Sequence, residues 1–205
     1  FIMAMPILGW VLYILVYGTN FRKTIRKRFE LADGMLFPYL DQSHLVLNAL
    51  GKESKSARNQ FAMLENDAGF PVYRNTEVVF YKEAMIGFEA QMEAISAAKK
   101  FIFMEYHAIE DRECFGEMKE LLLKKAKEGV EVRLFYDDVG SVGFISPHFV
   151  KELEEGGIQC RIFNPIVPLV NLFMNNRDHR KITVIDGKVG FTGGYNLAEE
   201  YFNIT

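Results

Sequence analysis

A histidine, a lysine and an aspartate follow one another at fixed spacing in residues 178–196, which read D-H-R-K-I-T-V-I-D-G-K-V-G-F-T-G-G-Y-N. His179, Lys181 and Asp186 form the pattern H-x-K-x-x-x-x-D, and Asn196 follows a pair of glycines. A lysine ammonium is a point charge suited to a phosphate oxygen, and an asparagine amide can donate to charge that develops there. Imidazole is both a nucleophile and a proton carrier near neutral pH. Together these residues predict a displacement reaction at phosphorus.

The same residues are expected on a β-hairpin, because Asp186-Gly187 is a signal for a two-residue turn with positive φ. Side chains alternate along a strand, so His179, Lys181 and Thr183 should share one face. The imidazole and the ammonium then point into the same space. Asp186 lies an odd number of residues from His179 and would face the opposite side of a straight strand. It serves either as a turn former or, if the strand bends, as a group that supports the site.

Three further positions complete the candidate site. Glu105 is a carboxylate on an otherwise apolar run, residues 101–106, and needs a partner that a cationic site would supply. Gly193 and Gly194 place bare backbone beside Asn196, where we expect phosphate contacts or support for them.

The roles of these residues are set by the chemistry of phosphorus. If His179 attacks, Lys181 and Asn196 hold the non-bridging oxygens. Asp186 or Glu105 then fixes the imidazole. In-line displacement also needs a proton donor at the leaving oxygen, so one imidazole cannot do both jobs at once. The pattern therefore predicts half of a site, completed by a second histidine from beyond Thr205 or from another chain, and His179 could be the attacking group or the acid.

Strand-like and helix-like segments alternate through the second part of the chain, which indicates an α/β fold with a sheet flanked by helices. The β-rich runs are residues 76–81, 101–106, 131–136 and 158–163. Apolar residues recur at helical spacing in residues 85–95 and 115–126, and a further helix is expected over residues 147–155.

The N-terminal segment predicts a membrane anchor. Residues 1–17 carry no charge, and five basic residues occur between Arg22 and Arg28. The run is slightly short of the ~20 apolar residues that span a bilayer, as if the sequence began part-way through the helix. The basic cluster predicts that the rest of the chain lies on the cytoplasmic side of the cell membrane. A cleaved signal peptide would carry its basic residues before the apolar run, and a buried core helix is the other alternative.

Three domains are therefore expected. Residues 1–21 form part of a transmembrane helix, and residues 22–70 form a basic juxtamembrane and linker segment whose most exposed link is residues 51–58. Residues 71–205 form a catalytic domain. Within it, residues 164–176 are strongly apolar yet carry two prolines, which favours either core packing or a lip that touches lipid.

Composition excludes several classes of function. The formal net charge of -3 gives no overall attraction to nucleic acid, and the sequence has no Arg-rich or aromatic stacking face. Cys114 and Cys160 lack metal-ligand spacing and are expected to be reduced thiols. We expect no metal or other cofactor.

The residues from His179 to Asn196 resemble the HKD signature of the phospholipase D superfamily. The wider sequence is similar to bacterial cardiolipin synthases in its apolar N-terminus, in Y-R-N-T-E-V at 73–78, in K-K-F-I-F-M-E-Y at 99–106 and in K-A-K-E-G-V-E-V-R-L-F-Y-D at 125–137. The resemblance covers nearly the whole chain. It implies a mixed sheet between helices and transfer of a phosphatidyl group between phosphatidylglycerol molecules, or from a related lipid, through a phosphohistidine and without a metal.

Two departures from the family pattern are visible. Members of this family carry two HKD copies, and this sequence has one. The E-Y-Y of many relatives reads E-Y-H here, with His107 in the last position. Two alternatives to the lipid enzyme stay open: a nuclease or phosphodiesterase that pairs two single-motif chains, and a non-catalytic membrane scaffold.

Overall fold

The computed structural model describes residues 5–17, 21–41, 43–165 and 177–202. The chain divides into two compact units, Phe1–Val79 and Phe80–Thr205, and each is described by itself.

The first unit is helical. Its elements are α1 (Pro6–Tyr17), α2 (Phe21–Leu36), the 3-10 helix η1 (Phe37–Tyr39), α3 (His44–Glu53) and α4 (Lys55–Ala68). Residues 6–17 of the apolar run expected to anchor the protein form α1, which has 12 residues. In the described ranges, no helix has both the length and the apolar character needed to cross a bilayer.

The expected exposed link at residues 51–58 is helical instead. α3 and α4 are interrupted only at Ser54, whose backbone is extended and whose Oγ accepts a hydrogen bond from the Ala57 N–H at 3.2 Å. A serine in this position satisfies one of the free N–H groups of the first turn, which is why α4 begins here. α4 ends at Ala68, and the next residue, Gly69, has a φ of 73°, the left-handed conformation that favours glycine after a helix.

The second unit is a mixed α/β fold. Its strands are β1 (Phe101–Tyr106), β2 (Glu131–Asp137), β3 (Gln159–Phe163), β4 (Lys181–Ile185) and β5 (Val189–Thr192). Its helices are α5 (Ala84–Ala97), α6 (Glu113–Lys127), α7 (Asp138–Ser141), α8 (Phe149–Glu155) and the 3-10 helix η2 (Glu199–Tyr201). The expected strands at 101–106, 131–136 and 158–163 are confirmed, as are the helices expected from the apolar stripes.

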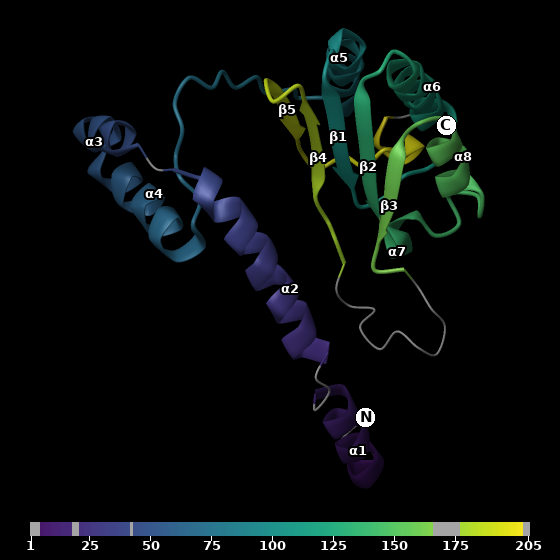
Figure 1. The fold of residues 1–205 in the computed structure, drawn as a ribbon, viewed down its shortest axis with the longest axis horizontal. Helices are drawn as coiled ribbons and strands as arrows, with labels where there is room; N and C mark the ends of the chain where they lie inside the picture. The colour runs from purple at the N-terminus through teal and green to yellow at the C-terminus, as the bar shows by residue number, and fades with distance from the viewer. Residues whose placement is uncertain (1–4, 18–20, 42, 166–176, 203–205) are drawn as a thin grey trace. The chain divides into compact units, whose positions relative to one another are not determined.

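The five strands form one sheet in the order β3-β2-β1-β4-β5 (Figure 1). β1, β2 and β3 run parallel, whereas β4 is antiparallel to both β1 and β5. The predicted hairpin is confirmed, and Asp186 and Gly187 have the expected positive φ values of 54° and 67°, but the connection from β4 to β5 has three residues because it also includes Lys188. Since β4 reverses direction, its first residues lie beside the last residues of β1.

The expected strand at residues 76–81 is wrong. The structure gives these residues no strand, and Val78 and Phe80 are more than four-fifths exposed. Their β-branched and aromatic side chains fit a pleated surface, but a strand forms only where a neighbouring strand supplies hydrogen bonds. Residues 76–81 instead span the boundary between the two units.

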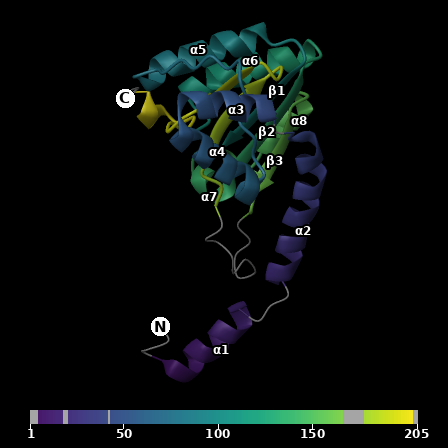
Figure 2. The ribbon, with the colours of Figure 1, turned by 90° about the vertical axis from the view of Figure 1, so that its left-hand side faces the viewer.

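The core of the second unit lies between one face of the sheet and helices α5, α6 and α8. Figures 1 and 2 both draw α5 and α6 beside β1 and β2. Burial alternates along β1, where Ile102, Met104 and Tyr106 are buried and the residues between them are partly exposed. The opposite face carries Phe103 and Val184, which line an open hollow of about 380 Å³. The side-chain alternation thus separates a buried core face from a partly exposed face.

Candidate active site

The predicted histidine and lysine lie at the edge of the sheet where β1 ends and β4 begins. Lys181 pairs with Tyr106 across the antiparallel β1–β4 ladder, and His179 precedes β4 by two residues. Gly193, Gly194 and Asn196 come after β5 in the chain. The carboxyl ends of parallel strands are the usual place for ligand sites in sheets of this kind.

His179 and Lys181 are joined by a direct contact. The Lys181 ammonium donates to the main-chain oxygen of His179 at 2.8 Å. His179 is exposed, whereas Lys181 is only 6 % exposed. Burial lowers the pKa of Lys181, and the nearby Asp178 opposes this change. A partly desolvated cation beside an exposed imidazole can attract an anionic group and present it to the ring.

Lys181 and Thr183 share one face of β4, as predicted. Thr183 accepts a hydrogen bond from the Gln91 amide at 2.7 Å and lies 3.1 Å from the Tyr106 hydroxyl. The Tyr195 hydroxyl donates to Gln91 at 2.9 Å. This buried network connects α5, β1, β4 and the segment after β5, and it forms a rigid layer behind Lys181.

Asn196 is buried and forms hydrogen bonds within the protein. It is 4 % exposed; its amide oxygen accepts from the Ala108 N–H at 3.1 Å, and its amide nitrogen donates to the Tyr201 hydroxyl at 3.1 Å. Gly193 and Lys181 both line a small cavity of about 10 Å³. Asn196 thereby connects the segment after β5 to the end of β1.

Asp186 lies at the opposite end of β4 from His179. Its carboxylate accepts three backbone hydrogen bonds, from Lys99, Lys100 and Phe101, at 2.9, 2.7 and 2.9 Å. The bonds from Phe101 and Lys99 in particular lower the pKa of Asp186. The structure therefore does not bring Asp186 to His179; it makes Asp186 both the turn residue of the hairpin and the anchor for the start of β1.

Glu105 also has no hydrogen bond to the His179 imidazole in the described structure. It forms an ion pair with Arg180, which donates in turn to Asp178 at 3.1 Å. Burial, and then the neighbouring Asp178, raises the pKa of Glu105 to about 7. Burial also acts to raise the pKa of Asp178, but hydrogen bonds with Glu105 and Arg180 outweigh it and hold that pKa below its usual value.

When Glu105 and Asp178 have one proton between them, the proton is therefore bound to Glu105 and Asp178 is ionised. Asp178 Oδ2 is buried and has no hydrogen-bond partner among the described groups. A protonated Glu105 can donate to the Asp178 carboxylate, whereas an ionised one cannot. The expected cationic partner of Glu105 is thus Arg180, and Asp178 is a second partner that the sequence did not reveal.

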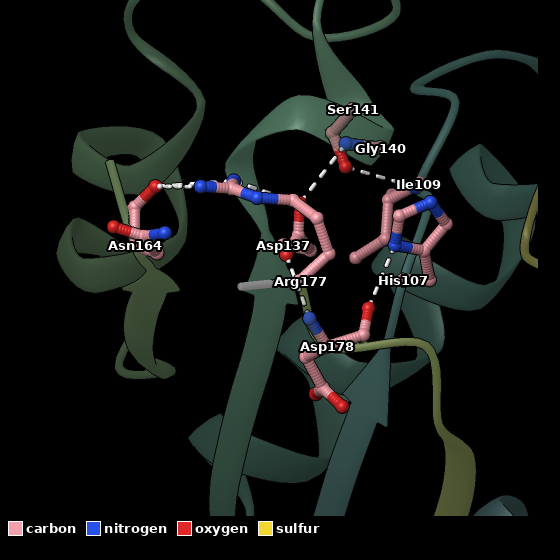
Figure 3. Close-up of polar contacts among 8 residues, drawn as sticks. All are labelled: His107, Ile109, Asp137, Gly140, Ser141, Asn164, Arg177 and Asp178. Atoms are coloured by element: carbon pink, nitrogen blue, oxygen red, sulfur yellow. Dashed lines mark hydrogen bonds and ion pairs between the residues drawn. The ribbon is translucent and has the colours of Figure 1, made fainter. Parts of the chain in front are cut away.

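Asp137 is a further residue that sequence reasoning missed. It is fully buried at the end of β2 and accepts from Gly140 N at 3.2 Å, Arg177 Nη1 at 3.2 Å and Asp178 N at 2.9 Å (Figure 3). Arg177 also donates to the Asn164 main-chain oxygen at 3.1 and 3.2 Å. Asp137 thus fixes the two residues that immediately precede His179. The available signal was a carboxylate directly after a buried strand.

Two sequence expectations fall on other parts of the chain. Residues 166–176 of the apolar segment lie outside the described residues. In the described ranges, no group of three or more His, Cys, Asp or Glu side chains could hold a metal ion, and Cys114 and Cys160 are buried free thiols.

The chain belongs to the family of cardiolipin synthase phospholipase D-like domains, whose model matches residues 92–205. Among named relatives, the cardiolipin synthase of Halalkalibacterium halodurans is 34 % identical over 96 % of this chain and 39 % of that protein. The cardiolipin synthase of Clostridium perfringens is 36 % identical over 96 % of this chain and 41 % of that protein. The chain thus spans less than half the length of the curated relatives it matches. An uncharacterized protein of Streptococcus mutans is 37 % identical over 98 % of this chain and 44 % of that protein.

Similarity to solved structures is weak. NucT from Helicobacter pylori aligns with a TM-score of 0.46 and 16 % identity, over 63 % of this chain and 78 % of that one.

Proposed function

We propose that the protein transfers a phosphatidyl group from one phosphatidylglycerol molecule to another, which yields cardiolipin and glycerol. His179 attacks the phosphorus of the first lipid, a phosphorus–nitrogen bond forms, and the bond to the headgroup glycerol breaks. A second imidazole protonates the departing glycerol oxygen. The headgroup hydroxyl of the second lipid then attacks phosphorus, gives its proton to that same imidazole and releases His179.

The observation that carries this proposal is the contact between the Lys181 ammonium and the His179 main chain at 2.8 Å, at an edge where the imidazole is exposed. In this geometry the ammonium binds a non-bridging phosphate oxygen while the ring approaches the phosphorus. Membership of the cardiolipin synthase family supports phosphatidyl transfer over other reactions at phosphorus.

The second imidazole comes from another HKD motif, either in a further part of a longer protein or in another chain. In-line displacement requires its proton on the side of phosphorus opposite the nucleophile. We assign the nucleophilic role to His179, and the second histidine acts as the acid and base.

We also propose that the protein acts at the cell membrane, with the catalytic domain on the cytoplasmic side. Support comes from the uncharged residues 1–17 and from the five basic residues between Arg22 and Arg28. Basic residues beside an apolar segment mark the cytoplasmic side and attract anionic lipid. Phosphatidylglycerol, the proposed substrate, is such a lipid.

The test is turnover of labelled phosphatidylglycerol by the full-length protein and three variants. Cardiolipin and glycerol should form with the wild type and with H148A, because His148 is an exposed histidine at the start of α8 and has no hydrogen bond, ion pair or ring contact with His179 or Lys181 in the described structure. H179A and K181A should form neither product. Cleavage of DNA without lipid turnover would replace the proposal with a nuclease, and no turnover of either substrate would favour a scaffold.

A further inference from the structure

His107 comes directly after β1 at the same edge of the sheet and occupies a tightly packed position. It is partly buried, and the backbone of Gly140 in α7 passes directly against it. A Cβ at position 140 would overlap the His107 main-chain oxygen and would lie 2.9 Å from its ring carbon Cε1. Only glycine allows this approach, so the position of His107 is fixed by its surroundings.

The His107 ring has one assignable tautomer. Its Nδ1 lies 2.7 Å from the main-chain oxygen of Asp178. A carbonyl oxygen can only accept, so Nδ1 carries the hydrogen and donates it. A histidine with a committed N–H has a fixed ring orientation.

The peptide groups of Asp178 are therefore held on both sides. Its N–H donates to Asp137 Oδ2 at 2.9 Å, and its carbonyl oxygen accepts from His107 (Figure 3). Asp178 directly precedes His179, so these two bonds fix the backbone from which the His179 side chain projects.

His107 makes a second contact, with the imidazole of His179 itself. The two ring centroids are 4.6 Å apart and the ring planes are inclined by 50°. This separation lies in the range of attractive aromatic pairs. No described residue forms a hydrogen bond with the His179 imidazole, so the ring contact from His107 is the described side-chain contact that can restrict its rotation.

We propose that His107 is a positioning residue for His179, which it orients through the Asp178 carbonyl and through ring contact. The inference deepens the proposed function and rests on it for the role of His179 as nucleophile. A nucleophile held at the attack angle reacts faster than one that samples several rotamers, and a displacement of about 1 Å can cost roughly a hundredfold in rate.

The two contacts can be separated by substitution in the full-length protein. H107N keeps an N–H donor near the position of Nδ1 but removes the ring, and H107F keeps the ring but removes the donor. H107A removes both, and H148A is the matched histidine control. Three quantities are measured: kcat and KM for phosphatidylglycerol, and the rate at which diethylpyrocarbonate modifies His179, which peptide mass spectrometry follows.

H107A should lower kcat by roughly 10- to 100-fold with KM within about twofold, as expected for lost orientation without lost binding. His179 should react faster with diethylpyrocarbonate, because one face of its ring is uncovered. H107N and H107F should each give an intermediate result. These two variants carry the test if H107A fails to fold, which a thermal unfolding curve reveals.

An unchanged rate of His179 modification in all three variants would overturn the positioning role, and so would a rise in KM at constant kcat. The chemical modification does not depend on lipid turnover. Failure of the wild type to make cardiolipin would thus remove the proposed function, while the modification rates would still decide whether His107 orients His179.

Discussion

Replacement of Asp137 by asparagine should lower the stability of the second unit substantially, although the two side chains have nearly the same shape. The Asp137 carboxylate receives donors from Gly140, Arg177 and Asp178. An asparagine offers one oxygen, and its amide N–H groups would face at least one of these donors. Arg177, whose side chain is only 15 % exposed, would also lose its ion pair with Asp137.

The magnitude can be worked out from these contacts. Removal of one partner from a buried ion pair costs ~3–5 kcal/mol, and a lost hydrogen bond to a charged group costs ~1.5–3 kcal/mol. Arg177 keeps its two bonds to the Asn164 oxygen, which offsets part of the loss. We therefore expect about 3 kcal/mol, which corresponds to a fall in Tm of about 10 °C for a unit of this size.

Thermal unfolding of the full-length wild type and D137N under one set of detergent conditions measures this effect. E155Q is the matched control, because Glu155 is an exposed carboxylate in α8 that lies 3.7 Å from Lys151. Its Tm should change by less than that of D137N, since surface ion pairs contribute ~0–1 kcal/mol. A Tm for D137N within about 2 °C of the wild type would refute the argument that Asp137 anchors the residues before His179.

Three other substitutions probe the same unit. Burial raises the pKa of Glu105 to about 7, so the stabilisation from its bound proton is complete below about pH 4.5 and is lost as pH rises through 7. The Tm of E105Q should therefore rise relative to the Tm of the wild type between pH 5 and pH 8. A Tm difference that stays constant over this range would contradict the prediction. Backbone donors lower the pKa of Asp186, so its contribution is present above about pH 3.8 and is lost as pH falls through the lowered value. D186N should lower Tm at pH 7 and flatten the acid side of the stability curve; loss of turnover at an unchanged Tm would instead indicate a catalytic role. G140A should lower both Tm and kcat because its Cβ meets His107, whereas G116A, where a Cβ has open space, should leave kcat unchanged.

The hairpin was predictable because its signals are local. Asp186-Gly187 can adopt the positive φ values that a tight hairpin connection requires, and alternation then puts Lys181 and Thr183 on one face. The expected strand at residues 76–81 failed for the complementary reason. A strand needs a partner, and the sequence of a β-rich run does not say whether one is present.

The contacts that hold His179 could not be read from the sequence. Asp137 and Asp178 are 41 residues apart, and only the pairing of β1 with both β2 and β4 brings them together. For Asp186, the sequence suggested a contact that the structure does not contain. Its place in the H-x-K-x-x-x-x-D pattern suggests a shared task with His179, but the length of β4 separates them.

The position of Asp186 explains the spacing of the motif in structural terms. β4 carries His179 just before one end, and the carboxylate just after the other end ties the sheet to the start of β1. The four residues between lysine and aspartate thus match the length of β4. One inserted residue would turn the side chains on one side of it to the wrong face. Enzyme designers who transplant this signature should therefore match the host strand first and the reactive groups second.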